Sequence, residues 1–105
     1  MAWISLVLAG LFEIVWAGAM KQSHGFSRLW PSVVTIGGMF ISFGLLSWSM
    51  RTLPLGTSYM IWTGIGAVGA FVVGIMVFGE AVTPMRVMAA LLIVGGLVMM
   101  KLATP

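Results

Sequence analysis

The chain has 105 residues, of which 61% are hydrophobic and 7% are charged, and its mean hydropathy is +1.17. Soluble domains carry about 25% charged residues, so this composition excludes an ordinary soluble fold and is typical of a membrane protein. The formal net charge of +3 comes from five basic and two acidic residues that are scattered, a pattern unlike that of nucleic-acid binders. With no cysteine, one histidine and two acidic side chains, we expect neither a protein-bound metal nor a cofactor.

Four apolar runs follow one another along the chain. The first is interrupted only by Glu13, the second begins at Pro31, and Thr83 followed by Pro84 predicts the start of the last. About 20 apolar residues cross the hydrocarbon core of a bilayer, so each run is long enough to span it. The sequence therefore predicts an all-α membrane protein with a single domain, residues 1–105, of four transmembrane helices. The expected helices cover residues 3–20, 31–50, 57–78 and 85–102. No basic region precedes the first run, so we expect it to remain in the mature protein.

Small residues mark two of the predicted helices. Gly66, Ala70 and Gly74 recur at the spacing that lets transmembrane helices approach closely, and Gly95 and Gly96 form a second small-residue patch. Two interpretations are open for these residues, packing within the chain and packing against a partner subunit.

Basic residues are almost evenly divided between the two ends of the predicted bundle. Arg51 and Lys101 lie at the end that holds both termini, and Lys21, Arg28 and Arg86 lie at the other. The positive-inside rule predicts orientation from an excess of Lys and Arg on one side of the membrane, and here that excess is nearly absent. We therefore expect the chain to insert in both orientations, the alternative being one orientation set by the insertion machinery or the amino terminus.

Glu13 lies near the middle of the first predicted span. A charged carboxylate at that depth costs about 2.5–3.5 kcal/mol on insertion scales, so its presence is a functional hypothesis by default. Removal from water favours the protonated form of a carboxyl group, which can then exchange its proton for a cation. The alternative is a neutral, hydrogen-bonded glutamic acid that only holds helices together. Glu80 and His24 are interpreted as loop residues.

Helical spacing predicts which residues surround this carboxylate. Aromatic, hydroxyl and small residues share its face or form stripes on the neighbouring helices: Gly10, Trp16, Ser42, Met39, Phe43, Tyr59, Trp62, Thr63 and Gly66. A carboxylate framed by indole rings suits a small organic cation, because the ring faces add cation–π attraction. The alternative is that Trp16, Tyr59 and Trp62 are ordinary packing aromatics. Trp3, Trp30 and Trp48, near span ends, are typical of interfacial anchors.

A bundle of four helices is too small to enclose a water-accessible site and also to move around it. We therefore expect a second copy, inserted in the opposite sense, because transporters commonly place the site between inverted repeats. Each site would then contain two Glu13 carboxylates. Competition of protons and substrate for that pair would let a proton gradient drive cation export.

Three segments resemble the small multidrug resistance family: GLFEIVWAGAMK (10–21), HGFSRLWPS (24–32) and LPLGTSYMIWTGIGAVGA (53–70). The resemblance covers essentially the whole chain, and Glu13 with Trp16 and Trp62 is similar to the guanidinium-exporter branch. It implies a transporter rather than an enzyme, a multi-pass protein of the cytoplasmic (inner) membrane, and an antiparallel homodimer that exchanges protons for guanidinium ion at Glu13. It also implies that four side chains hold the paired Glu13 residues by hydrogen bonds and that Gly10 lines the pocket. These side chains are Trp16, Ser42, Tyr59 and Trp62.

Met60 departs from the small residue expected in that branch. The flexible residues near the pocket are candidates for setting the substrate range or forming a portal, and Thr63 is a further candidate. These flexible residues are Met39, Phe43 and Met60. The first alternative function is broad export of quaternary ammonium and other hydrophobic cations. The second is a non-transporting helical subunit of a larger membrane complex.

Overall fold

The computed structural model of the chain describes residues 1–104, which fold into four helices. They are α1 (Ala2–Gln22), α2 (Leu29–Ser49), α3 (Leu55–Phe78) and α4 (Pro84–Ala103). Each is long and apolar enough to cross a membrane, and the described residues contain no strand. The predicted all-α membrane fold is therefore confirmed at the level of a single chain.

The helices extend beyond the apolar runs that predicted them. α1 continues through Lys21 and Gln22, and α2 begins at Leu29, before Pro31. The expectation that Pro31 is the first helical residue is thus wrong. Proline is tolerated at the third position because the first four backbone N–H groups of a helix have no intrahelical partner.

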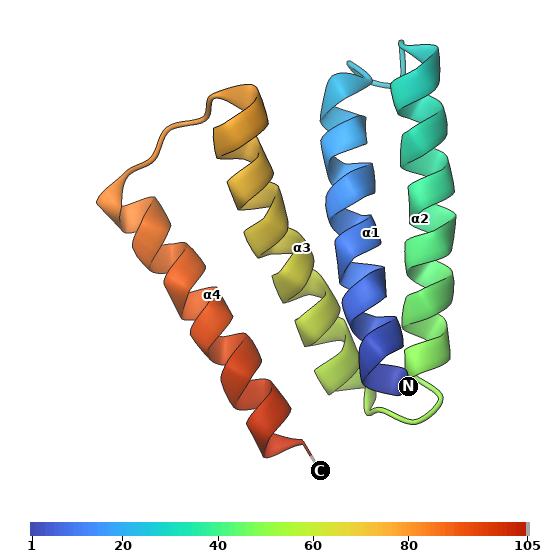
Figure 1. Cartoon of the computed structure of the whole chain (residues 1–105), viewed down its shortest axis with the longest axis vertical. Helices are drawn as coiled ribbons and strands as arrows, with labels where there is room; N and C mark the ends of the chain where they lie inside the picture. Colours follow the sequence, from blue (N-terminus) through green and yellow to red (C-terminus); the bar gives the residue numbers. More distant parts are fainter. Residues whose placement is uncertain (105) are drawn as a thin grey trace.

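The four helices lie side by side in one layer, in the order α4, α3, α1, α2 (Figure 1). The described chain measures 43 × 34 × 16 Å along its principal axes. A single helix with its side chains is about 10–12 Å thick, so the layer is little more than one helix deep. Both broad faces of the layer are therefore open.

Glycines hold α1 close to α3. A Cβ added at Gly10 would come within 2.6 Å of Ile65, and one at Gly69 would overlap Ile14. The close approach that glycine permits is the usual means by which membrane helices gain packing energy. The buried apolar core is small and lies where α1, α2 and α3 meet: Leu6, Ala9, Leu46, Ile61 and Trp62.

α4 stands apart from the rest of the layer. Its backbone comes close only to α3 within the described chain, and none of its residues is buried. Gly79 ends α3 in the left-handed conformation (φ 67°), and the Thr83 hydroxyl accepts a hydrogen bond from the Arg86 backbone N–H, as the predicted cap requires. The connection between α3 and α4 is thus well defined, although the helices it joins diverge.

Candidate functional site

Glu13 is the twelfth residue of α1, so its Cα lies about 16 Å along the helix from its start. This depth is about half of the hydrocarbon thickness. The side chain is half-buried, and its Oε1 atom is fully buried with no hydrogen-bond partner among the described residues. A buried polar oxygen normally has a partner, so this atom is available to a ligand or a proton.

Gly66 of α3 provides the space that the carboxylate occupies. A Cβ added at Gly66 would overlap both the carboxylate carbon and Oε1 of Glu13. Sequence spacing assigned Gly66 to the same stripe as Tyr59 and Trp62 and to a helix-packing motif. The structure adds that the Glu13 carboxyl group occupies the space where a side chain at position 66 would lie.

Four aromatic rings form a continuous wall across α1, α2 and α3. Phe43 lies between two indoles, with its ring centroid 6.2 Å from that of Trp16 and 5.8 Å from that of Trp62. Tyr59 continues the wall, 5.6 Å from Trp62. Edge and tilted contacts of this kind fix ring orientation. Phe43, a candidate for substrate range from sequence, is therefore one of the two inner rings of the wall.

Ser42 joins α1, α2 and α3 by hydrogen bonds. The Trp62 indole N–H donates to the Ser42 hydroxyl over 2.9 Å, and that hydroxyl donates to the Ala9 carbonyl over 2.7 Å. Within the described single chain, Glu13 has no hydrogen bond to any of the four side chains implied to hold it, which are Trp16, Ser42, Tyr59 and Trp62. The indole N–H of Trp16 is buried and unpaired.

The remaining predicted residues fall into separate groups. Tyr59, Met60 and Thr63 line an apolar groove of about 370 Å³ between α3 and α4, while Met39 is half-buried on α2. Gly10 packs against Ile65 on α3. Of the small residues, Gly74 lies against Glu80, Ala70 borders the cleft beside it, and Gly95 and Gly96 face open space.

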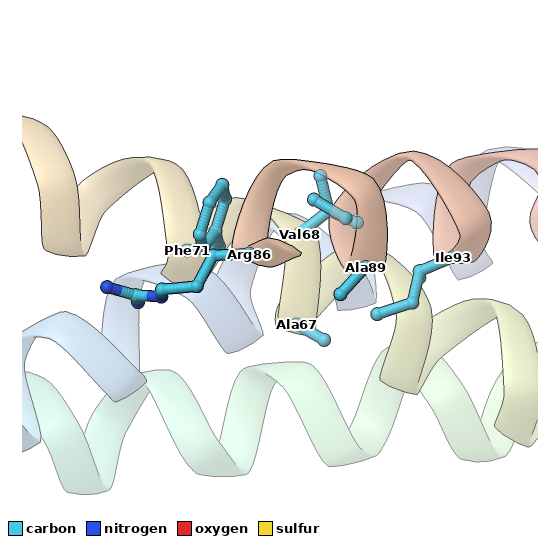
Figure 2. A pocket seen from close by; sticks show the side chains of 7 residues that line it. Ala67, Val68, Phe71, Arg86, Ala89 and Ile93 are labelled. Atoms are coloured by element: carbon cyan, nitrogen blue, oxygen red, sulfur yellow. The ribbon is translucent and has the colours of Figure 1, made fainter. Parts of the chain in front are cut away.

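A second groove between α3 and α4 lies nearer the loop that joins them. Ala67 and Ala89 leave room between the helices, and the Arg86 guanidinium lies 5.2 Å from the Phe71 ring centroid (Figure 2). Arg86 also forms an exposed ion pair with Glu80 at 3.4 Å. Because its guanidinium is engaged there, we assign it to the α3–α4 connection and not to the Glu13 site.

Two contributors to the site were missed from sequence. The Ala9 carbonyl accepts the Ser42 hydrogen bond, and Gly38 lets α2 approach Trp16, where an added Cβ would lie 3.0 Å from the Trp16 Cβ. Every residue has a backbone carbonyl, so the sequence does not indicate which carbonyl accepts a side-chain hydrogen bond. Gly38 carried a signal, since it lies four residues before Ser42 and therefore on the same helix face.

The site combines an unpaired buried carboxylate oxygen, an aromatic wall and a buried unpaired indole donor. No group of three metal-ligating side chains comes together within residues 1–104. This set of groups can bind a proton or a small cation at the middle of a membrane. The fold and the site define a small helical transporter.

The chain belongs to the small multidrug resistance family, whose model matches residues 1–93. It is 54% identical over 104 residues to a guanidinium exporter of Citrobacter freundii, covering 99% of each chain. It is 55% identical over 104 residues to a guanidinium exporter of Escherichia coli K12, again covering 99% of each chain. A guanidinium exporter of Salmonella typhimurium strain LT2 is 56% identical over 103 residues, covering 98% of each.

Membership in this family makes the chain a transporter and not an enzyme, as predicted. It is a multi-pass protein of the inner membrane, given its four spanning helices and the bacteria in which its relatives occur.

Proposed function

We propose that this protein exports guanidinium ion in exchange for protons and that Glu13 binds both. The observation that carries the proposal is the buried, unpaired Oε1 of Glu13 at the middle of a transmembrane helix. Guanidinium is planar and matches a carboxylate in bidentate fashion, so a carboxylate with free lone pairs suits it. The names of the relatives at 54–56% identity support the same substrate.

The proposed unit is an antiparallel homodimer with two Glu13 carboxylates facing each other. Three features support it. The layer is only 16 Å deep, so one chain cannot enclose a site. α4 has no buried residue, and Gly95 and Gly96 face open space, so this helix is free to pack against another copy. Trp16, whose indole N–H is buried and unpaired, and exposed Tyr59 would then complete their hydrogen bonds across the pair.

Proteoliposomes provide the test of transport. Wild-type protein should move labelled guanidinium against a proton gradient, and Glu13→Gln should abolish that movement because an amide cannot accept and release the proton. Glu80→Gln is the matched control, since Glu80 is exposed and paired with Arg86 outside the site. Full transport by Glu13→Gln would contradict the proposed role of Glu13. No transport by wild type would contradict the proposal as a whole and favour a non-transporting subunit.

Dual orientation has its own test, for which the natural absence of cysteine is convenient. A single cysteine introduced at Ser27, in the α1–α2 loop, should react with an impermeant maleimide from both sides of the membrane. Reaction from one side only would rule out the antiparallel pair, even if transport persisted.

Quaternary ammonium export is the second candidate, and the groove lined by Tyr59, Met60 and Thr63 favours it. This groove is apolar and about 370 Å³ in volume, so it accommodates alkyl groups. Met60→Ser should leave guanidinium transport intact and reduce transport of tetraalkylammonium ions. If the ratio of the two transport rates did not change, Met60 would have no role in setting the substrate range.

A further inference from the structure

One end of the layer is basic and has no acidic side chain among its described residues. It is formed by the start of α1, the α2–α3 loop and the end of α4 (Figure 1). Arg51 and Lys101 are exposed there. The two acidic side chains of the protein lie elsewhere, Glu13 at mid-span and Glu80 at the opposite end, where it pairs with Arg86. Within residues 1–104, the positive charge of this end is therefore not compensated by an ion pair.

Trp3 lies beside both basic residues of this end, Arg51 and Lys101. The Lys101 ammonium lies 4.2 Å from the centroid of the Trp3 ring, which holds the long lysine side chain in one place. Trp3 also borders a hollow of about 600 Å³ that is shared with Trp48, Arg51 and Thr52. The hollow thus combines a guanidinium, a hydroxyl and two indoles at the depth where tryptophan meets lipid headgroups.

An apolar groove of about 280 Å³ begins on the other side of Trp3 and runs toward the middle of the bilayer. It lies between α1, α3 and α4, and Lys101 stands at its outer end. Its main lining residues are Trp3, Val7, Ile61, Ile65, Leu97 and Lys101. None of these residues belongs to the aromatic wall beside Glu13.

We propose that this end of the protein binds an anionic phospholipid of the surrounding bilayer. The phosphate lies over Trp3 between Arg51 and Lys101, and one acyl chain occupies the groove. Each basic residue near an anionic lipid surface strengthens the attraction, and the groove adds apolar contact that a free anion does not make.

Native mass spectrometry of the purified full-length protein tests the proposal, with phosphatidylglycerol and phosphatidylcholine of identical acyl chains as probes. Wild-type protein should retain phosphatidylglycerol preferentially. The double variant Arg51→Gln/Lys101→Gln should weaken phosphatidylglycerol binding by about 25-fold, about fivefold for each basic residue, and leave phosphatidylcholine binding unchanged. The matched control Lys21→Gln/Arg28→Gln removes the same charge from the opposite end and should retain the preference.

The apolar part of the site is tested separately by Val7→Trp. Val7 is 44% exposed, so the substitution fills the groove without removing a buried contact or a charge. It should weaken binding of phosphatidylglycerol, whereas excess inorganic phosphate should not displace the bound lipid. Equal losses in the two double variants, displacement by phosphate, or unchanged binding in Val7→Trp would each overturn the proposal.

Discussion

The unpaired oxygen of Glu13 has a direct consequence for how binding depends on pH. If guanidinium replaces a proton on this carboxylate, lowering the pH opposes binding, because the displaced proton is then more abundant. The dissociation constant should rise about tenfold per pH unit for each proton displaced. Calorimetric titration of guanidinium across several pH values measures this slope. Glu80→Gln should keep the slope, and a flat profile in wild type would show that protons and substrate do not compete.

Gly66 sets the room available to that same carboxylate. Gly66→Ala forces the Glu13 side chain out of its position, because the new Cβ would overlap it. Displacement of this kind costs about 1–3 kcal/mol, more than the roughly 1 kcal/mol by which alanine favours a helix. We expect guanidinium binding to weaken by tenfold or more, that is, by about 1.4 kcal/mol.

The control for that substitution is Gly37→Ala. An added Cβ at Gly37 meets nothing within 4 Å, so this variant should bind guanidinium as wild type does. Isothermal titration of both variants makes the comparison. If Gly66→Ala bound normally, the contact between Gly66 and Glu13 would have no role in the site.

At the scale of helices, Ser42 is the residue that connects α1, α2 and α3. Ser42→Ala removes the acceptor of the Trp62 indole and the donor to the Ala9 carbonyl. Leaving a buried donor unpaired costs about 1–3 kcal/mol, while hydrogen bonds between membrane helices average about 0.6 kcal/mol in double-mutant cycles. We expect a coupling energy of about 1 kcal/mol between Ser42 and Trp62.

A cycle of Ser42→Ala and Trp62→Phe, followed by unfolding in sodium dodecyl sulfate, measures this coupling. Ser47→Ala is the matched control on α2, because Ser47 is exposed. It should leave the free energy of unfolding unchanged. Additive losses for Ser42 and Trp62 would mean that their hydrogen bond does not join the helices.

Sequence patterns predicted the helices well and their contacts less well. Hydrophobic length located all four spans, since the bilayer thickness imposes that length on each helix. Helix ends were misplaced because Lys21 and Gln22 continue α1 in the interface, where polar side chains are tolerated. Of the site, the position of Glu13 followed from composition. The pairing of Ser42 with the Ala9 carbonyl did not, because it depends on how far α2 is rotated against α1.

At the scale of the whole molecule, α4 is the helix that packs least within one chain, since it contacts only α3 and has no buried residue. We expect Gly95→Leu/Gly96→Leu to reduce the dimer fraction at least tenfold, because the added side chains keep another helix from close approach. Gly37→Leu is the control, since Gly37 also faces open space but lies on α2. Size-exclusion chromatography with light scattering measures the molar mass. A stable dimer in the double variant would place the interface on another helix.

The 16 Å depth of the layer means that the protein has almost no interior of its own. In the proposed antiparallel pair the site is completed only when two chains meet within the membrane, so added lipid should act as a diluent. Transport per chain should fall as the lipid-to-protein ratio of proteoliposomes rises and should recover when two copies are fused through a linker that permits opposite orientations. In a cell, resistance to the substrate should then increase more steeply than in proportion to the number of copies made.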